Sequence, residues 1–227
     1  MVTSLFVTGC GRGIGLEIVR QAIGLGWEVA GSVRDDRAAE NLARQFPERF
    51  RVFVFDVTDA DAVRAAAAGH GGTVDILVNN AGIIGPGRQS TLDMDFDGFA
   101  GTLAVNTLAP LRVVQAFLPN LRKSAHPRIL TISSAMGTMS NAKSDRIAYR
   151  ASKAAVNKVM QGLATDLEGE GIAVRVLHPG WVRTDMGGAA ADISPQESAA
   201  GILDIARDTT MAVTGTFVNW DGTTVPW

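Results

Sequence analysis

Short apolar segments alternate with longer amphipathic ones along the whole chain. Seven of the short segments are rich in β-branched residues, and several are apolar at consecutive positions, as in strands buried between two helical layers. We expect strands at 5–8, 28–33, 51–55, 76–79, 128–132, 172–177 and 216–219. The segment SPQESAAGILDIARD begins as helices commonly do, with Ser194 as the N-cap and Pro195 at the first helical position.

This alternation predicts an α/β fold of the Rossmann type, a doubly wound, mostly parallel seven-stranded sheet with helices on both faces. The 227 residues contain no repeat, no low-complexity tract and no Pro/Ser-rich linker. We therefore expect residues 1–227 to form a single domain with the catalytic site built in. Apolar residues make up 46% of the chain and charged residues 19%, which excludes a disordered protein.

The charge and the reactive residues narrow the range of partners. A net charge of -2 predicts neither a nucleic-acid partner nor an anionic membrane partner. No apolar run is long enough to span a bilayer, and no leader-like segment opens the chain. Cys10 is the single cysteine and cannot form an internal disulfide, while the three histidines are scattered without metal-ligand spacing. We expect a cytoplasmic protein that binds no metal.

A glycine-rich turn, VTGCGRGIG, joins the first expected strand to the first expected helix. Gly9, Gly13 and Gly15 would let the backbone approach a pyrophosphate there, and the free N–H groups of the helix N-terminus would stabilise its charge. A tight turn without a ligand is the alternative. The context of strand, turn and helix favours a dinucleotide site.

Further motifs follow this turn in a fixed order. They are TGxxxGxG from Thr8, FDVTD with Asp56 and Val57, NNAG with Asn80, Ala81 and Gly82, VNTLAP with Asn106, ISS with Ser133 and Ser134, YRASK with Tyr149 and Lys153, and HPGWVRTDM. Together they resemble the short-chain dehydrogenase/reductase family over nearly the whole chain. Within that family, AYRASKAAVN and the ending FVNWDGTTVPW are most similar to carbonyl reductases of the sniffer and C-factor type.

The resemblance implies a set of cofactor-binding residues. They are Thr8, Gly9, Arg12, Gly13, Ile14, Gly15, Arg34, Asp56, Val57, Asn80, Ala81, Gly82, Tyr149, Lys153, Pro179, Gly180, Val182 and Thr184. In family members the residue at Asp56 hydrogen-bonds the adenine. As an alternative, Asp56 could only cap the helix that follows the third strand.

Tyr149 and Lys153 are four residues apart, so on a helix they share one face and can converge on one site. A free tyrosine has a pKa near ~10, and a nearby ammonium favours its phenolate form. Tyr149 can therefore give a proton to a carbonyl oxygen, or take one from an alcohol. A solvated surface pair is the alternative, but Tyr149 is the only tyrosine in the chain and lies within the motif set.

Ser134, just beyond the fifth strand, is expected to hydrogen-bond the same carbonyl oxygen. Ser133 and Ser140 stay open as rivals for this role, since the segment from Ser134 to Tyr149 is slightly longer than the family norm. Asn106 resembles the family asparagine that anchors a water leading from Lys153 to solvent. We therefore assign Asn106, Ser134, Tyr149 and Lys153 as the catalytic set.

The choice of cofactor depends on the end of the second strand. Enzymes of this fold that use NAD commonly place an acid there, whereas an arginine accommodates the 2′-phosphate of NADP. This chain has Val33 in that place and Arg34 next, with Arg12 as a second cation in the glycine turn. We expect NADP(H), while Asp35 and Asp36 leave NAD(H) open.

The predicted function is hydride transfer between NADP(H) and a small carbonyl or alcohol substrate, with Tyr149 as the acid/base. The short segment after Thr184 predicts an open site for an apolar substrate, with Met136, Met139, Trp181 and Met186 as candidate walls. A regulatory or signalling protein of the C-factor type, which binds the cofactor with little turnover, is the alternative. Relatives commonly form dimers or tetramers, so a homodimer or homotetramer is expected.

Overall fold

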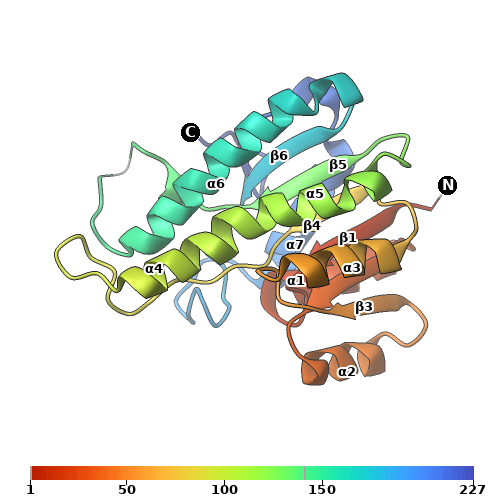
Figure 1. Cartoon of the computed structure of the whole chain (residues 1–227), viewed down its shortest axis with the longest axis horizontal. Helices are drawn as coiled ribbons and strands as arrows, with labels where there is room; N and C mark the ends of the chain where they lie inside the picture. Colours follow the sequence, from red (N-terminus) through yellow and green to blue (C-terminus); the bar gives the residue numbers. More distant parts are fainter. Residues whose placement is uncertain (1, 141) are drawn as a thin grey trace.

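The computed structural model describes residues 2–140 and 142–227, and they form a seven-stranded sheet in the order β3-β2-β1-β4-β5-β6-β7 (Figure 1). The strands are β1 Ser4–Thr8, β2 Glu28–Val33, β3 Phe50–Val54, β4 Ile76–Asn79, β5 Arg128–Ile132, β6 Ala173–His178 and β7 Thr216–Asn219. Every pair of neighbouring strands is parallel. The predicted Rossmann-type fold is confirmed.

The strand positions agree closely with the sequence prediction. Four strands begin and end at the expected residues, β1 begins one residue earlier, and β3 and β6 are shifted by one residue at both ends. This accuracy follows from burial, because strands covered on both faces appear in a sequence as uninterrupted β-branched runs.

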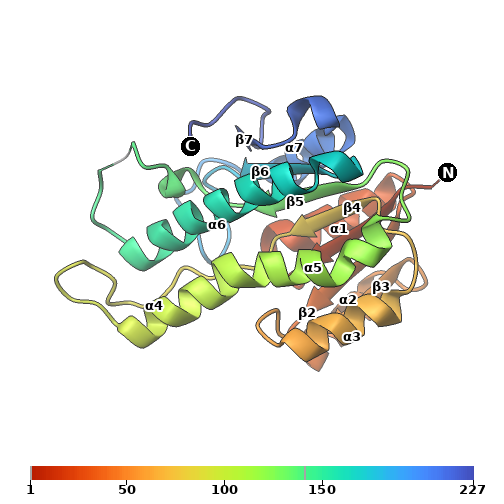
Figure 2. The same cartoon turned by 45° about the horizontal axis from the view of Figure 1, so that its top comes forward.

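Helices cover both faces of the sheet (Figures 1 and 2). The longer ones are α1 Gly13–Gly24, α2 Asp36–Gln45, α3 Ala60–His70, α4 Phe96–Leu103, α5 Ala109–Leu121, α6 Ile147–Asp166 and α7 Pro195–Asp208. The short ones are η1 Ala104–Leu108, η2 Ala135–Gly137, η3 Glu168–Glu170 and η4 Met211–Val213. Residues of α1, α2 and α7 share one apolar core, and residues of α3, α5 and α6 share the other.

Alternation along β1 divides its side chains between the two cores. Phe6 packs in the core of α3, α5 and α6, whereas Leu5 and Val7 pack in the core of α1, α2 and α7. All three are fully buried, and each contributes roughly 1.5–3 kcal/mol relative to an exposed position. Both faces of the central strand therefore hold a helical layer, as its unbroken apolar run requires.

The strand order reverses between β1 and β4, since β2 and β3 lie on one side of this pair and β5, β6 and β7 on the other. In an open parallel sheet, the loops at the carboxyl ends of the two strands diverge at this point and leave a crevice. The loops after β1 and β4 carry the glycine turn and the NNAG motif. The topology therefore brings these two motifs together.

Two helical features agree with or refine the sequence analysis. α7 begins with a capping box, in which Ser194 and Glu197 satisfy each other's backbone N–H groups, and Pro195 takes the first helical position as predicted. α4, η1 and α5 follow one another without a break from residue 96 to residue 121, and η1 is a π-helical turn that holds Asn106. Such turns often occur at functional sites. No helix in the part of the chain that the structure describes could cross a membrane.

Candidate active site

The predicted site residues gather at one edge of the sheet, in the loops that follow β1 to β6, at the starts of α1 and α6, and in η1, which holds Asn106. The glycine turn after β1 is tightly constrained. Gly9 and Gly13 have positive φ angles of 69° and 56°, a region that favours glycine. A Cβ atom at Gly9 would lie 2.8 Å from the Cα atom of Ala81, and one at Gly15 would lie 2.5 Å from the carbonyl oxygen of Gly9. Gly9 and Gly15 therefore allow the turn to pack closely against its neighbours.

The N-terminus of α1 differs from those of α2, α3, α4 and α7. The residue before it, Arg12, makes no side-chain cap, and no acidic residue lies in its first turn. By contrast, α2, α3, α4 and α7 are capped by the side chains of Asp35, Asp59, Asp95 and Ser194. Uncapped N–H groups at a glycine-rich helix start suit a bound phosphate. The residues present therefore fit a dinucleotide.

Thr8 and Asn80 join the ends of β1 and β4. The Thr8 hydroxyl accepts hydrogen bonds from the backbone N–H groups of Asn80 and Ala81, both at 3.1 Å. The Asn80 amide donates to the carbonyl oxygens of Thr8 and Gly9, both at 3.0 Å. These side chains fix the shape of the crevice, because each bond spans the point where the two loops diverge.

The loop after β6 closes the opposite side of the glycine turn. Thr184 lies against Gly13, since a Cβ atom there would be 3.3 Å from the Thr184 methyl group. Arg12 forms an exposed ion pair with Asp185 of the same loop. In this loop Val182 is buried, the Pro179 carbonyl accepts a hydrogen bond from Ser198, and Gly180 has a positive φ of 85°. Of the other predicted cofactor residues, Val57 is buried and Ile14 is half-buried. The two loops together frame the space over α1.

The polar residues after β2 and β3 have distinct surroundings. Asp56 accepts hydrogen bonds from the backbone N–H and the hydroxyl of Thr58, and these bonds, together with the charge of Arg34, lower its pKa. Asp59, rather than Asp56, caps α3, so the capping alternative for Asp56 is wrong. Asp35 is engaged as the cap of α2 at 2.9 Å from the Ala38 N–H, while Arg34 is exposed.

Tyr149 and Lys153 lie on α6 and are buried, with exposed fractions of 8% and 5%. The Lys153 ammonium lies 5.7 Å from the centre of the Tyr149 ring and donates a 2.8 Å hydrogen bond to the carbonyl of Ile132. Burial lowers the pKa of Lys153 to about 8. Burial also raises the pKa of Tyr149, an effect that the Ser134 hydroxyl and the charge of Arg146 oppose. The phenol is therefore protonated at neutral pH.

The three candidate serines differ in what they contact. Ser134 is buried and accepts a 3.1 Å hydrogen bond from the Met136 N–H. Its hydroxyl also lowers the pKa of the Tyr149 phenol by hydrogen bonding. Ser133 donates to the Asn157 side chain at 2.5 Å, away from the phenol, and Ser140 is exposed. The geometry favours Ser134 over its two rivals.

Asn106 holds the loop after β4 with its whole side chain. Its Oδ1 accepts from the Ile83 N–H at 2.9 Å, and its Nδ2 donates to the Ile83 carbonyl at 2.8 Å and to the Ser152 hydroxyl at 3.0 Å. Gly82 lies directly beside this clamp, because a Cβ atom there would be 3.3 Å from Oδ1 and 3.7 Å from the Lys153 ammonium. The side chain thus positions the loop, and its predicted role toward a water stays a prediction.

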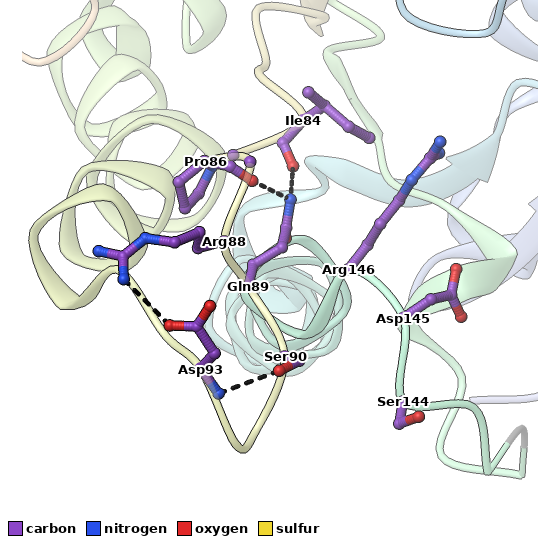
Figure 3. Close-up of a pocket in the computed structure, with 11 residues that line it drawn as sticks. Ile84, Pro86, Arg88, Gln89, Ser90, Asp93, Ser144, Asp145 and Arg146 are labelled. Atoms are coloured by element: carbon purple, nitrogen blue, oxygen red, sulfur yellow. Dashed lines mark hydrogen bonds and ion pairs between the residues drawn. The ribbon is translucent and has the colours of Figure 1, made fainter.

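Gln89 is a residue of the site that the sequence analysis missed. Its side-chain oxygen accepts from the Tyr149 N–H at 3.1 Å, and its own carbonyl accepts from the Ile147 N–H at 2.9 Å. Its amide donates to the carbonyls of Ile84 and Pro86 (Figure 3). Gln89 therefore caps the helix that carries Tyr149 from a loop 60 residues away. No motif marks it in the sequence.

The candidate walls of an apolar pocket are largely exposed. The exposed fractions are 83% for Met139, 50% for Trp181 and 42% for Met186, while Met136 is half-buried. A cavity of about 510 Å³ lies instead between the loop after β4 and the segment before α6, and charged and polar groups contribute much of its lining. Among residues 2–140 and 142–227, no group of three or more potential ligands could hold a metal.

Comparisons with known proteins identify the family of the chain. Residues 3–193 match the family model described as short chain dehydrogenase. The C-signal protein of Myxococcus xanthus is 42% identical over 158 residues, which cover 69% of this chain and 94% of that protein. The NADPH-bound carbonyl reductase from chicken fatty liver superposes with a TM-score of 0.91 at 34% identity, covering 100% and 99% of the two chains. The carbonyl reductase Sniffer of D. melanogaster does so with a TM-score of 0.93 at 30% identity, covering all of both chains. The chain belongs to the short-chain dehydrogenase family.

Proposed function

We propose that this protein is an NADP(H)-dependent carbonyl reductase that transfers hydride to a small aldehyde or ketone, or in reverse from the alcohol. The observation that carries the proposal is the burial of Tyr149 and Lys153 together, with the Ser134 hydroxyl acting on the phenol. Lys153 is buried and makes no ion pair within residues 2–140 and 142–227, which is unfavourable for a charge, so its place beside the chain's only tyrosine favours a catalytic role.

In the reductive direction Tyr149 gives its phenolic proton to the carbonyl oxygen. Its raised pKa keeps that proton in place at neutral pH until charge develops on the substrate oxygen. Ser134 hydrogen-bonds the same oxygen and orients the carbonyl. The bound nicotinamide supplies the hydride.

Lys153 has two roles in this scheme. Its positive charge, 5.7 Å from the ring centre of Tyr149, stabilises the phenolate left after proton transfer. The resemblance to the family also implies that Lys153 binds the nicotinamide ribose, and Lys153 lies beside Gly82 at the carboxyl end of β4. Asn106 holds the loop after β4 at Ile83, and Gln89 of the same loop binds the start of α6.

The preference for NADP(H) depends on Arg34. Three observations support it: Arg34 is exposed after β2, Asp35 is engaged as a helix cap, and the chicken carbonyl reductase of the same fold is NADPH-bound. Arg12 is a second cation near the glycine turn, although it pairs with Asp185 here.

Arg34→Ala is expected to lower NADPH affinity by about one to two orders of magnitude and to leave NADH affinity nearly level. A charge-assisted contact with the 2′-phosphate contributes roughly 1.5–3 kcal/mol, and NADH lacks that phosphate. Titration of both cofactors into wild type and variant measures the ratio. Arg44→Ala, at the exposed far end of α2, is the matched control. An unchanged NADPH/NADH ratio in Arg34→Ala would remove the basis for NADP(H).

The function itself is tested by NADPH oxidation with a panel of aldehydes, ketones, quinones and diketones. We expect turnover with at least one class and little with NADH. Saturable NADPH binding without turnover of any carbonyl in the panel would contradict the proposal.

Ser134→Ala is expected to lower kcat by ~10²-fold while cofactor binding is retained, because it removes one hydrogen bond to the developing oxyanion. Ser133→Ala and Ser140→Ala are the controls, and both should keep kcat within a few-fold of wild type. If either control loses activity and Ser134→Ala does not, the assignment of the serine is wrong.

A signalling protein that binds the cofactor with little turnover is the second candidate. The observation that favours it is the 42% identity to the C-signal protein. A protein that only binds has no evident need for Ser134, Tyr149 and Lys153 together, and this set favours catalysis. The NADPH oxidation panel separates the two candidates.

A further inference from the structure

The cavity of about 510 Å³ lies between the loop after β4 and the segment that leads into α6 (Figure 3). The loop 84–90 and Asp93 line one side of it, and residues 144–146, which lead into α6, line the other. Gln89 belongs to the wall and accepts a hydrogen bond from the Tyr149 N–H. The cavity is of a size typical of small-molecule sites. It lies where the part of a substrate remote from the carbonyl could extend.

One charge in this wall is unbalanced. Arg88 pairs with Asp93 at 3.0 Å, and Asp145 pairs with Arg150 at 2.8 Å. Arg146 has no carboxylate within ion-pair distance among the residues that the structure describes. The wall therefore presents one cation that no acidic group of the cavity neutralises.

The backbone of Arg146 is also unusual. Its φ of 52° and ψ of 45° lie in the left-handed region, which is strained for a residue with a side chain. Helix capping does not explain this conformation, because the Arg146 side chain makes no cap and Gln89 binds the first N–H groups of α6. In Figure 3 the Arg146 side chain extends away from Asp145 and from the Arg88–Asp93 pair.

Arg146 directly precedes α6, the helix that carries Tyr149. Its charge favours the phenolate form of Tyr149, three residues along the chain. Arg146 and Gln89 line the same cavity, and Gln89 accepts a hydrogen bond from the Tyr149 N–H. A group held by the guanidinium would therefore lie at the end of α6 that carries Tyr149. An arginine fork matches a carboxylate with two parallel hydrogen bonds.

We propose that Arg146 binds a carboxylate of the substrate and makes the enzyme selective for carbonyl compounds that carry an acidic group. The inference rests on the proposed carbonyl reduction and deepens it by naming a substrate class. It differs from the apolar substrate expected from the sequence, because the cavity wall carries four charged side chains, Arg88, Asp93, Asp145 and Arg146.

The test compares 4-formylbenzoate with 4-formylbenzamide, which have similar shapes and differ in charge. Wild type should have the higher kcat/KM for the benzoate. Arg146→Gln should lower kcat/KM for the benzoate by about 10- to 100-fold, mainly through a higher KM. For the benzamide, kcat/KM of the variant should stay within about threefold of wild type. Arg146→Lys should recover part of the loss. Lys143→Gln, an equal charge change at an exposed position of the same segment, should leave the ratio unchanged.

A benzoate/benzamide ratio unaltered by Arg146→Gln, or lowered equally by Lys143→Gln, would overturn the inference while carbonyl reduction stands. If neither aldehyde is reduced, calorimetric binding of 4-formylbenzoate to wild type and Arg146→Gln decides the role of Arg146 without turnover, and equal affinities overturn it. Should the variant fail to fold, ionic strength gives the answer in wild type. Added salt should lower kcat/KM for the benzoate and leave that for the benzamide unchanged, because it screens only the charged contact. An equal effect of salt on both compounds would contradict the inference.

Discussion

Tyr149→Phe is expected to reduce kcat for carbonyl reduction by about 10²- to 10⁴-fold while the protein folds and binds its cofactor. The substitution removes only the phenolic hydroxyl. The ring stays in its buried place on α6, where the Lys153 ammonium lies 5.7 Å from its centre. No other tyrosine in the chain could replace the lost proton donor.

Three measurements separate loss of chemistry from loss of structure in this variant. NADPH oxidation gives kcat, fluorescence titration gives the cofactor Kd, and thermal unfolding gives Tm. We expect only kcat to change strongly, and Ser140→Ala, at an exposed position in the segment before α6, should match wild type in all three. A kcat within tenfold of wild type in Tyr149→Phe would show that another group delivers the proton.

The sheet could be predicted from the sequence because its determinants are local. Each strand is a short β-branched run, and each loop at the carboxyl edge begins where that run ends. The close packing at Gly9 and Gly15 could likewise be predicted, because both belong to the glycine-rich motif between strand and helix. In the structure, a Cβ atom at either position would collide with a neighbouring chain segment. The order of the motifs then indicated which loops meet at the site.

Residues whose role depends on distant parts of the chain could not be predicted. Gln89 caps a helix 60 residues further along, and the Asn106 side chain clamps a loop 23 residues earlier. The strained backbone of Arg146 has no sequence signature, because left-handed conformations usually fall on glycine or asparagine. The capping alternative for Asp56 was wrong because Asp59, three residues later, also fits the N-cap pattern.

Lys153→Met is expected to lose nearly all turnover and to weaken cofactor binding, yet to raise the stability of the cofactor-free protein. The ammonium supports both the Tyr149 phenolate and the ribose in the proposed scheme. Burial lowers its pKa from 10.5 to about 8, so the folded protein holds this charge at neutral pH against an unfavourable environment. Methionine keeps the length and apolar stem of the side chain without the charge.

The sign and pH range of the stability effect follow from proton linkage. Between about pH 8 and 10.5 the unfolded chain binds more protons at this lysine than the folded chain does, so its unfavourable contribution shrinks as pH rises. Below about pH 8 the contribution is constant, at roughly 3 kcal/mol for a shift of this size. The variant also loses the hydrogen bond to Ile132, and this loss offsets about 1 kcal/mol or more of the stability gained by removing the buried charge.

We therefore expect Lys153→Met to gain about 1–2 kcal/mol in the free energy of unfolding at pH 7, and less at pH 9 to 10. Urea unfolding of the cofactor-free protein across this range measures the difference. Lys158→Met on the same helix is the matched control, because Lys158 is exposed and its variant should show no such pH dependence. In wild type, activity that depends on the charged lysine should decline as pH rises through about 8. A variant less stable than wild type at pH 7 would mean that the Ile132 hydrogen bond outweighs the burial of the charge, and unchanged cofactor affinity would remove the ribose role.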